Sequence, residues 1–103
     1  MTGMDFKYFM PEVYQAVAGK NHIVYAFMND GSIRLVNMEP FIKEGGVFEA
    51  LKDDDFFTKK LTVMNNTVAW DAGGNRDEYK CIDIDPIFIY NDCQIVSDID
   101  EPD

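Results

Sequence analysis

The sequence predicts a single α+β domain with about four to six antiparallel strands and two or three short helices. Two hairpin signals support this fold class: Asp30-Gly31 and Asn65-Asn66 each lie between runs rich in β-branched and aromatic residues. A change of period supports it as well, because Pro40 and Asp85-Pro86 open segments with helical spacing of apolar residues. The 103 residues, 47% of them hydrophobic, suffice for one core and are too few for two domains.

The first part of the domain is predicted to be a three-stranded antiparallel meander. Strands are expected over residues 13–18, 22–28 and 32–37. The second strand is apolar on both of its alternating faces, which indicates a central strand covered on both sides. Asp30-Gly31 is expected to supply the positive φ angles of a tight primed hairpin turn.

Three short helices are expected to pack on the strands. One turn over residues 39–44 has Pro40 at its first helical position and stops at Gly45-Gly46. The second helix begins at Asp53-Asp54-Asp55, whose carboxylates suit the positive end of a helix dipole. The third begins at Asp85-Pro86, where the aspartate is a good N-cap and proline suits the next position.

A second hairpin and two terminal segments complete the predicted organisation. Residues 61–64 and 67–71 are expected to pair around Asn65-Asn66. The folded domain is expected to cover residues 11–96. Residues 1–10 form an N-terminal extension that is suited to pairing with a sheet edge, its own or that of a second copy. Residues 97–103 form an acidic tail that is expected to be disordered.

One stretch of the chain carries a family resemblance. It runs Trp70-Asp71-Ala72-Gly73-Gly74-Asn75-Arg76-Asp77 and continues at Cys81-Ile82-Asp83-Ile84-Asp85-Pro86. With the order of elements from Pro11 to Tyr90, this stretch resembles the bacterial proteins classified as domain of unknown function 2442, in a branch with an inserted loop. The resemblance implies a curved antiparallel sheet with short helices packed on it, and it brings no enzyme activity, cofactor or ligand. Some relatives look like members of toxin–antitoxin-like gene pairs.

Charge narrows the classes of partner. Nine Lys and Arg stand against nineteen Asp and Glu, which gives a net charge of -10. Such a surface repels phosphate backbones and anionic lipids, so neither nucleic acid nor membrane is an expected partner, whereas a basic protein is. The N-terminus has neither a basic start nor an unbroken apolar stretch, so a cytoplasmic location is expected. Cys81 and Cys93 would be reduced there, although the sequence leaves a disulfide between them open.

No residue is predicted to be catalytic, to bind a cofactor or to ligate a metal. Asp53-Asp54-Asp55 lacks the alternation and central glycine of a calcium loop, so helix capping is the favoured interpretation. His22 is the sole imidazole; as a general base it would need a carboxylate or nucleophile within reach, and a structural or exposed position is the favoured interpretation. Cys81 and Cys93 have no evident activating partner.

Two hypotheses about function remain. The first is a non-catalytic binding module for a basic protein encoded nearby, the chain itself being a monomer or weak homodimer. The second is a small-molecule or metal-ion binding protein, or a minor enzyme, with carboxylates converging in a pocket near the loop from Trp70 to Asp85. The candidate contact residues are Trp70, Arg76, Asp77, Asp83 and Asp85. The plainer interpretation of Trp70 is a place in the core, and that of Arg76 is an internal contact with a carboxylate that pins the loop.

Overall fold

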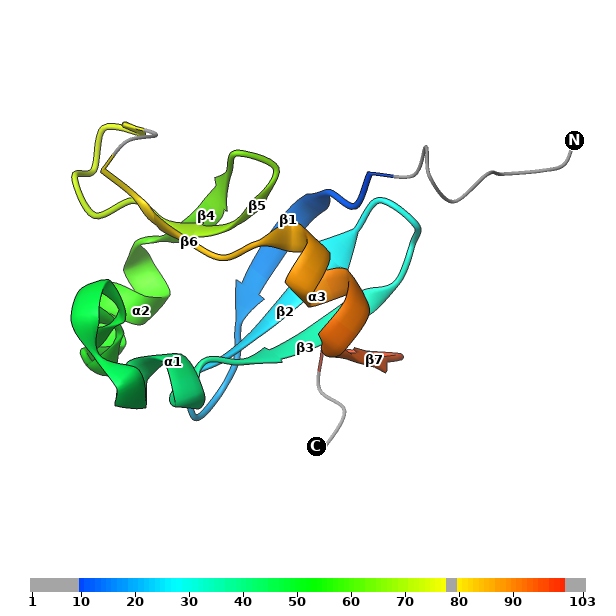
Figure 1. Cartoon of the computed structure of the whole chain (residues 1–103), viewed down its shortest axis with the longest axis horizontal. Helices are drawn as coiled ribbons and strands as arrows, with labels where there is room; N and C mark the ends of the chain where they lie inside the picture. The colour runs from blue at the N-terminus through cyan, green and yellow to red at the C-terminus, as the bar shows by residue number, and fades with distance from the viewer. Residues whose placement is uncertain (1–9, 78–79, 100–103) are drawn as a thin grey trace, which may run out of the picture.

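A computed structural model describes residues 10–77 and 80–99 of the chain (Figure 1). Within these residues, three strands are followed by three short helical segments, three further strands, a helix and a last strand. In chain order the elements are β1 (Val13–Ala18), β2 (Ile23–Met28), β3 (Ile33–Asn37), α1 (Glu39–Glu44), the 3₁₀ helix η2 (Gly46–Lys52), α2 (Asp54–Lys59), β4 (Leu61–Met64), β5 (Thr67–Trp70), β6 (Ile82–Asp83), α3 (Pro86–Asp92) and β7 (Gln94–Val96).

The strands form two antiparallel sheets, which confirms the α+β fold class. The larger sheet has the order β1-β2-β3-β7, and the smaller has the order β4-β5-β6. The three predicted meander strands and the predicted second hairpin are all present. The structure also contains two short strands that were not predicted, β6 and β7. After α3 the chain returns as β7, which pairs with β3 at the edge of the larger sheet (Figure 1).

Strand β2 is the central strand that its two apolar faces predicted. Val24, Ala26 and Met28 point into the main core, whereas Ile23 and Tyr25 belong to a second cluster on the opposite face. The main core lies where the larger sheet meets the helices and the smaller sheet. It draws on every layer through Val13, Val24, Ala26, Met28, Val36, Met38, Ile42, Leu51, Phe57, Val68, Trp70, Ile82, Ile84 and Ile89.

The two hairpin turns differ from one another. Asn65 and Asn66 both have positive φ, at 56° and 64°, as a primed two-residue turn requires. The primed turn predicted at Asp30-Gly31 is wrong, because only Gly31 has a positive φ. The Gly31 N–H donates to the Met28 carbonyl at 3.0 Å, and the chain closes a longer loop before β3 begins. The physical reason is local: the Asp30 carboxylate accepts from the N–H and hydroxyl of Ser32.

The predicted helix ends are confirmed by their caps. The Asp53 carboxylate accepts from the N–H groups of Asp55 and Phe56 at the start of α2. The Asp85 carboxylate accepts from the Ile87 N–H at 2.9 Å and begins α3. Helix α1 ends at Gly45, whose φ is 84°.

Both predicted terminal segments fall mainly outside the described residues. Of the extension over 1–10, the structure describes only Met10, which is exposed. Of the acidic tail, it describes residues 97–99. Ile99 packs there against the second cluster, which contains Val96.

Candidate functional site

The loop after β5 is organised by one carboxylate. Asp71 Oδ1 accepts from the Gly74 N–H at 3.1 Å, and its Oδ2 accepts from the Arg76 N–H at 2.9 Å. Both donors belong to residues with positive φ, 76° at Gly74 and 59° at Arg76. Because a side chain disfavours this backbone region, the hydrogen bond from Arg76 holds a conformation that the chain would rarely adopt alone.

The Arg76 side chain then ties this loop to the neighbouring hairpin. Its guanidinium donates to Thr62 Oγ1 at 3.3 Å and to the Val63 carbonyl at 3.0 Å. The side chain therefore pins the loop to strand β4 as expected, but the acceptors are a hydroxyl and a backbone carbonyl instead of the predicted carboxylate.

Trp70 is a core residue and has no surface to offer a partner. Its side chain is fully buried, and its ring lies 5.4 Å from that of Phe57. The indole N–H donates to the Phe57 carbonyl at 3.0 Å, which ties β5 to α2. The core position, which was the plainer interpretation of Trp70, is therefore the one that the structure shows, and the indole N–H already has its acceptor.

The candidate carboxylates of the second hypothesis do not converge near Trp70. Asp83 is exposed and accepts from Asn65 Nδ2 at 3.2 Å. Asp85 is committed to capping α3. Asp77 is half-buried at the end of the described part of the loop. Of the five predicted residues, Arg76 lines a pocket beside this loop.

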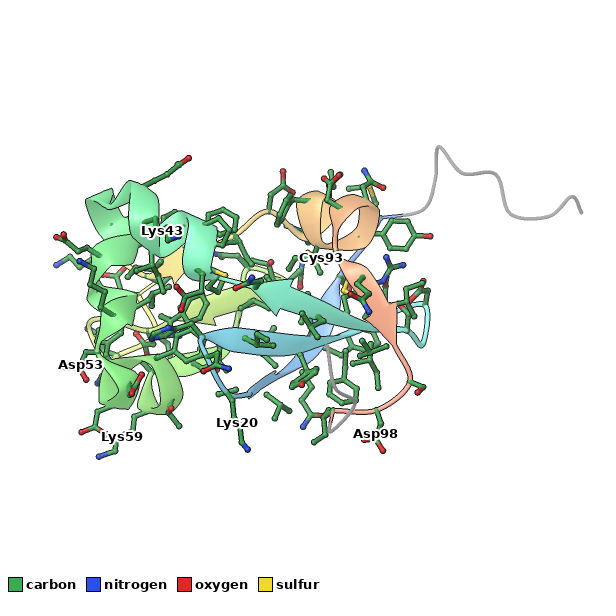
Figure 2. All side chains as sticks on the ribbon, turned by 90° about the horizontal axis from the view of Figure 1, so that it is seen from below. Lys20, Lys43, Asp53, Lys59, Cys93 and Asp98 are labelled. Atoms are coloured by element: carbon green, nitrogen blue, oxygen red, sulfur yellow. The ribbon has the colours of Figure 1, made fainter. Side chains whose placement is uncertain are left out.

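That cavity is a polar pocket of about 300 Å³ beside the Asp71 loop. Three of its lining side chains are cationic, and they come from the end of α2 and from the loop; Lys59, the last residue of α2, reaches the surface (Figure 2). The pocket is lined by Lys59, Lys60, Leu61, Thr62, Asp71, Gly74 and Arg76. Sequence analysis missed the two lysines, since adjacent lysines at a helix end are usually solvated. The available signal was their position directly before the hairpin that leads to the loop.

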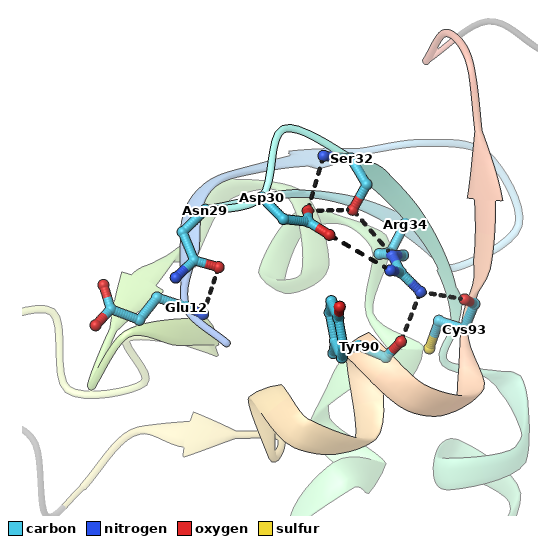
Figure 3. A network of polar contacts seen from close by, with 7 residues as sticks. All are labelled: Glu12, Asn29, Asp30, Ser32, Arg34, Tyr90 and Cys93. Carbon is cyan, nitrogen blue, oxygen red and sulfur yellow. Dashed lines mark hydrogen bonds and ion pairs between the residues drawn. The ribbon is translucent and has the colours of Figure 1, made fainter. Parts of the chain in front are cut away.

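A second polar centre, at Arg34, fastens α3 and β7 to the meander (Figure 3). Arg34 is buried, and its Nη1 donates to the carbonyls of Tyr90 and Cys93 at 2.6 and 3.3 Å. Its Nε donates to Ser32 Oγ at 3.0 Å, and Nη2 lies 3.8 Å from the Asp30 carboxylate. The Arg34 guanidinium thereby donates hydrogen bonds to backbone carbonyls at the C-terminal end of α3, where the helix dipole favours a positive charge.

Two further effects of Arg34 are electrostatic. Its guanidinium carbon lies 4.7 Å from the centre of the Tyr90 ring, a cation–π distance. Partial burial of Asp30 raises its pKa, but hydrogen bonds from Ser32 and the Arg34 charge outweigh that, and the pKa lies below its ordinary value of 3.8. Asp30 is thus held as the anion that the network needs.

His22 lies between two carboxylates. Its Nδ1 is 2.8 Å from Glu39 Oε2, and its Nε2 is 3.3 Å from Asp54 Oδ1. Its ring meets the ring of Phe57 edge-on at 5.2 Å. Glu39 opens α1 and Asp54 opens α2, so one imidazole joins the β1–β2 turn to the first residues of two helices.

The thiol of Cys93 is kept in its neutral form. Burial, reinforced by the neighbouring Asp92 carboxylate and only partly opposed by Arg34, raises the pKa of Cys93 to about 11. Only about one thiol in a thousand is then ionised at pH 8, and the thiolate is the reactive form.

In a Cys81→Ser variant we therefore expect iodoacetamide at pH 8 to alkylate native Cys93 at least about tenfold more slowly than in urea. Mass spectrometry of timed samples measures both rates. The native rate should rise with pH through the pKa of the thiol, about 11, and level off above it. Equal rates in buffer and urea at pH 8 would contradict a suppressed thiolate.

Across the described ranges 10–77 and 80–99, no helix is long and apolar enough to cross a bilayer. The same residues contain no group of three or more His, Cys, Asp or Glu side chains placed to hold a metal ion. Comparisons with protein-family models, with curated proteins and with solved structures found no match to the chain. The resemblance to domain of unknown function 2442 therefore stays a prediction.

Proposed function

We propose that this chain is a non-catalytic protein-binding module that uses an acidic face to bind a basic protein encoded nearby, as in a toxin–antitoxin-like pair. The distribution of charge carries the proposal. Residues 81–103 contain seven Asp and Glu and no Lys or Arg, so most of the net charge of -10 resides in this segment. The described part of the segment builds β6, α3 and β7 and contains four of these seven residues; α3 and β7 lie next to one another (Figure 1).

This acidic face, defined as the exposed surface of α3, β7 and their flanking residues, also presents apolar side chains. Ile87 on α3 is 47% exposed and Ile95 on β7 is 60% exposed. The exposed carboxylates of Asp83, Asp92 and Asp98 flank them along the chain. Apolar side chains within a charged rim are typical of protein interfaces, and the charges steer encounter with a partner of opposite sign.

The edge position of β7 offers a second mode of contact. Strand β7 pairs with β3 from Gln94 to Val96, and no other strand of the described residues pairs with it, so it is an edge strand of the sheet that these residues form. Strand addition at such an edge supplies main-chain hydrogen bonds, and the exposed Ile95 supplies side-chain contact.

The test compares two variants that each remove two exposed carboxylates. Asp92→Asn with Asp98→Asn changes the acidic face, and Glu44→Gln with Glu49→Gln changes the α1–η2 region. A partner is isolated with the wild-type chain, identified by mass spectrometry and purified. We expect it to be basic, and we expect its Kd to rise about tenfold for the first variant and by less than about twofold for the second.

Salt provides the second readout. Raising the ionic strength should slow association with the wild-type chain, because steering between opposite charges is screened. An acidic partner, or a Kd that both variants change equally, would contradict the proposal.

A further inference from the structure

We infer that the pocket beside the Asp71 loop is a binding site for a compact dianionic oxyanion, the phosphate group of a small phosphorylated molecule. The pocket is built from the end of α2, the start of β4 and the loop after β5. It shares no lining residue with α3 or β7, so this activity goes beyond the acidic face proposed above.

The charge of the lining is opposite to that of the protein. Lys59, Lys60 and Arg76 supply three cations and Asp71 one carboxylate, in a chain with a net charge of -10. Within the described residues neither lysine forms an ion pair, and Lys60 is only partly exposed. Both oxygens of Asp71 accept backbone N–H groups of its own loop. The excess positive charge of the pocket is thus left for a ligand.

The lining also retains hydrogen-bond donors. A guanidinium carries five N–H groups. That of Arg76 donates one hydrogen bond to Thr62 and one to Val63, so other N–H groups remain to donate to a ligand. Because Thr62 Oγ1 accepts from Arg76, its own hydroxyl hydrogen is free to donate. The Lys60 Nζ lies 3.6 Å from where a Cβ on Gly74 would stand, so the ammonium sits directly against the bare loop backbone.

The loop that carries Arg76 is preorganised. Asp71 and Gly74 fix the backbone, and Arg76 is held at a φ of 59°. Because the Arg76 guanidinium is already held in position, it loses little conformational freedom when it binds an anion, and this favours binding. A sparsely populated backbone that aims a charged residue at a cavity is a frequent property of ligand sites.

Size and polarity select the ligand class. A volume of about 300 Å³ lies at the lower end of ligand pockets and suits a small molecule. One carboxylate and three cations leave an excess of two positive charges, which matches a phosphate monoester dianion better than a monocarboxylate.

Isothermal titration calorimetry of the full chain at low ionic strength, with glycerol 3-phosphate and with inorganic phosphate as probes, tests this inference. We expect saturable binding of both. Lys60→Gln should raise the Kd about tenfold, whereas Lys43→Gln, which removes the same charge from the exposed face of α1 (Figure 2), should change it less than about twofold. Lys59→Gln serves as the second pocket variant if Lys60→Gln fails to fold in circular dichroism.

Three outcomes would overturn the inference. One is the absence of saturable binding to the wild-type chain at tens of millimolar phosphate. Another is equal weakening by the pocket and control variants, which would indicate only general attraction to positive charge. The third is acetate binding as tightly as phosphate, which would refute a dianion site.

Discussion

Trp70→Ala is expected to lower the free energy of unfolding by about 3–5 kcal/mol, enough to leave a marginally stable domain largely unfolded. The side chain is fully buried at the junction of β5 and α2. Its removal opens a cavity and leaves the Phe57 carbonyl without its indole donor. Urea denaturation followed by circular dichroism measures the loss, since the change removes the only tryptophan fluorophore.

Two further variants separate packing from surface roles. Trp70→Phe keeps most of the ring and loses the indole N–H, so it should cost about 1–3 kcal/mol and stay folded. Tyr14→Ala removes an aromatic side chain that is 68% exposed and should change stability by less than about 0.5 kcal/mol. Tyr14→Ala matching Trp70→Ala in cost would show that Trp70 is not a core anchor.

Arg34→Met is expected to lower the free energy of unfolding by about 3 kcal/mol while keeping the length of the side chain. The substitution leaves the carbonyls of Tyr90 and Cys93 without their donor and the Asp30 carboxylate without its cation. Lys43→Met, the same kind of change on exposed α1, should cost less than about 0.5 kcal/mol.

Arg34→Lys gives a sharper test of geometry. A lysine keeps the charge but lacks the planar fork that reaches Ser32 and the α3 carbonyls together, so we expect only partial recovery. Amide hydrogen exchange should show the loss of protection concentrated in α3 and β7, the elements that the arginine fastens. Full recovery of stability with lysine, or loss spread evenly over the sheet, would contradict this account.

Local chemistry explains which parts of the fold were predictable. Asn65-Asn66 and the Asp53 and Asp85 caps depend on neighbouring residues alone, and the structure confirms them. The primed turn predicted at Asp30-Gly31 is wrong because the Asp30 carboxylate accepts hydrogen bonds from Ser32, which changes the turn type. Strand β7 forms by pairing with β3, which lies about 60 residues earlier in the chain. Its three residues are too few to show the alternating pattern from which a strand is predicted.

Little of the candidate pocket could be predicted from the sequence. A pocket with converging carboxylates was expected near Trp70, and of its five candidate residues Arg76 is in the lining of the pocket beside the Asp71 loop, whose charged side chains are three cations and one carboxylate. Its other cations come from the residues just before β4. The hairpin register, with Leu61 opposite Trp70, brings them beside the loop that follows β5. A pattern read along the chain gives no register, so Lys59 and Lys60 could not be joined to Arg76 from sequence alone.

The segregation of charge between the acidic face and the pocket can be tested in one NMR titration series on the ¹⁵N-labelled chain. A short oligolysine peptide should shift amides of α3 and β7, and inorganic phosphate should shift those around Lys60, Thr62 and Gly74, with no residues in common. Overlapping sets of shifted amides, or shifts scattered over the whole surface with either probe, would show that the two surfaces are not distinct.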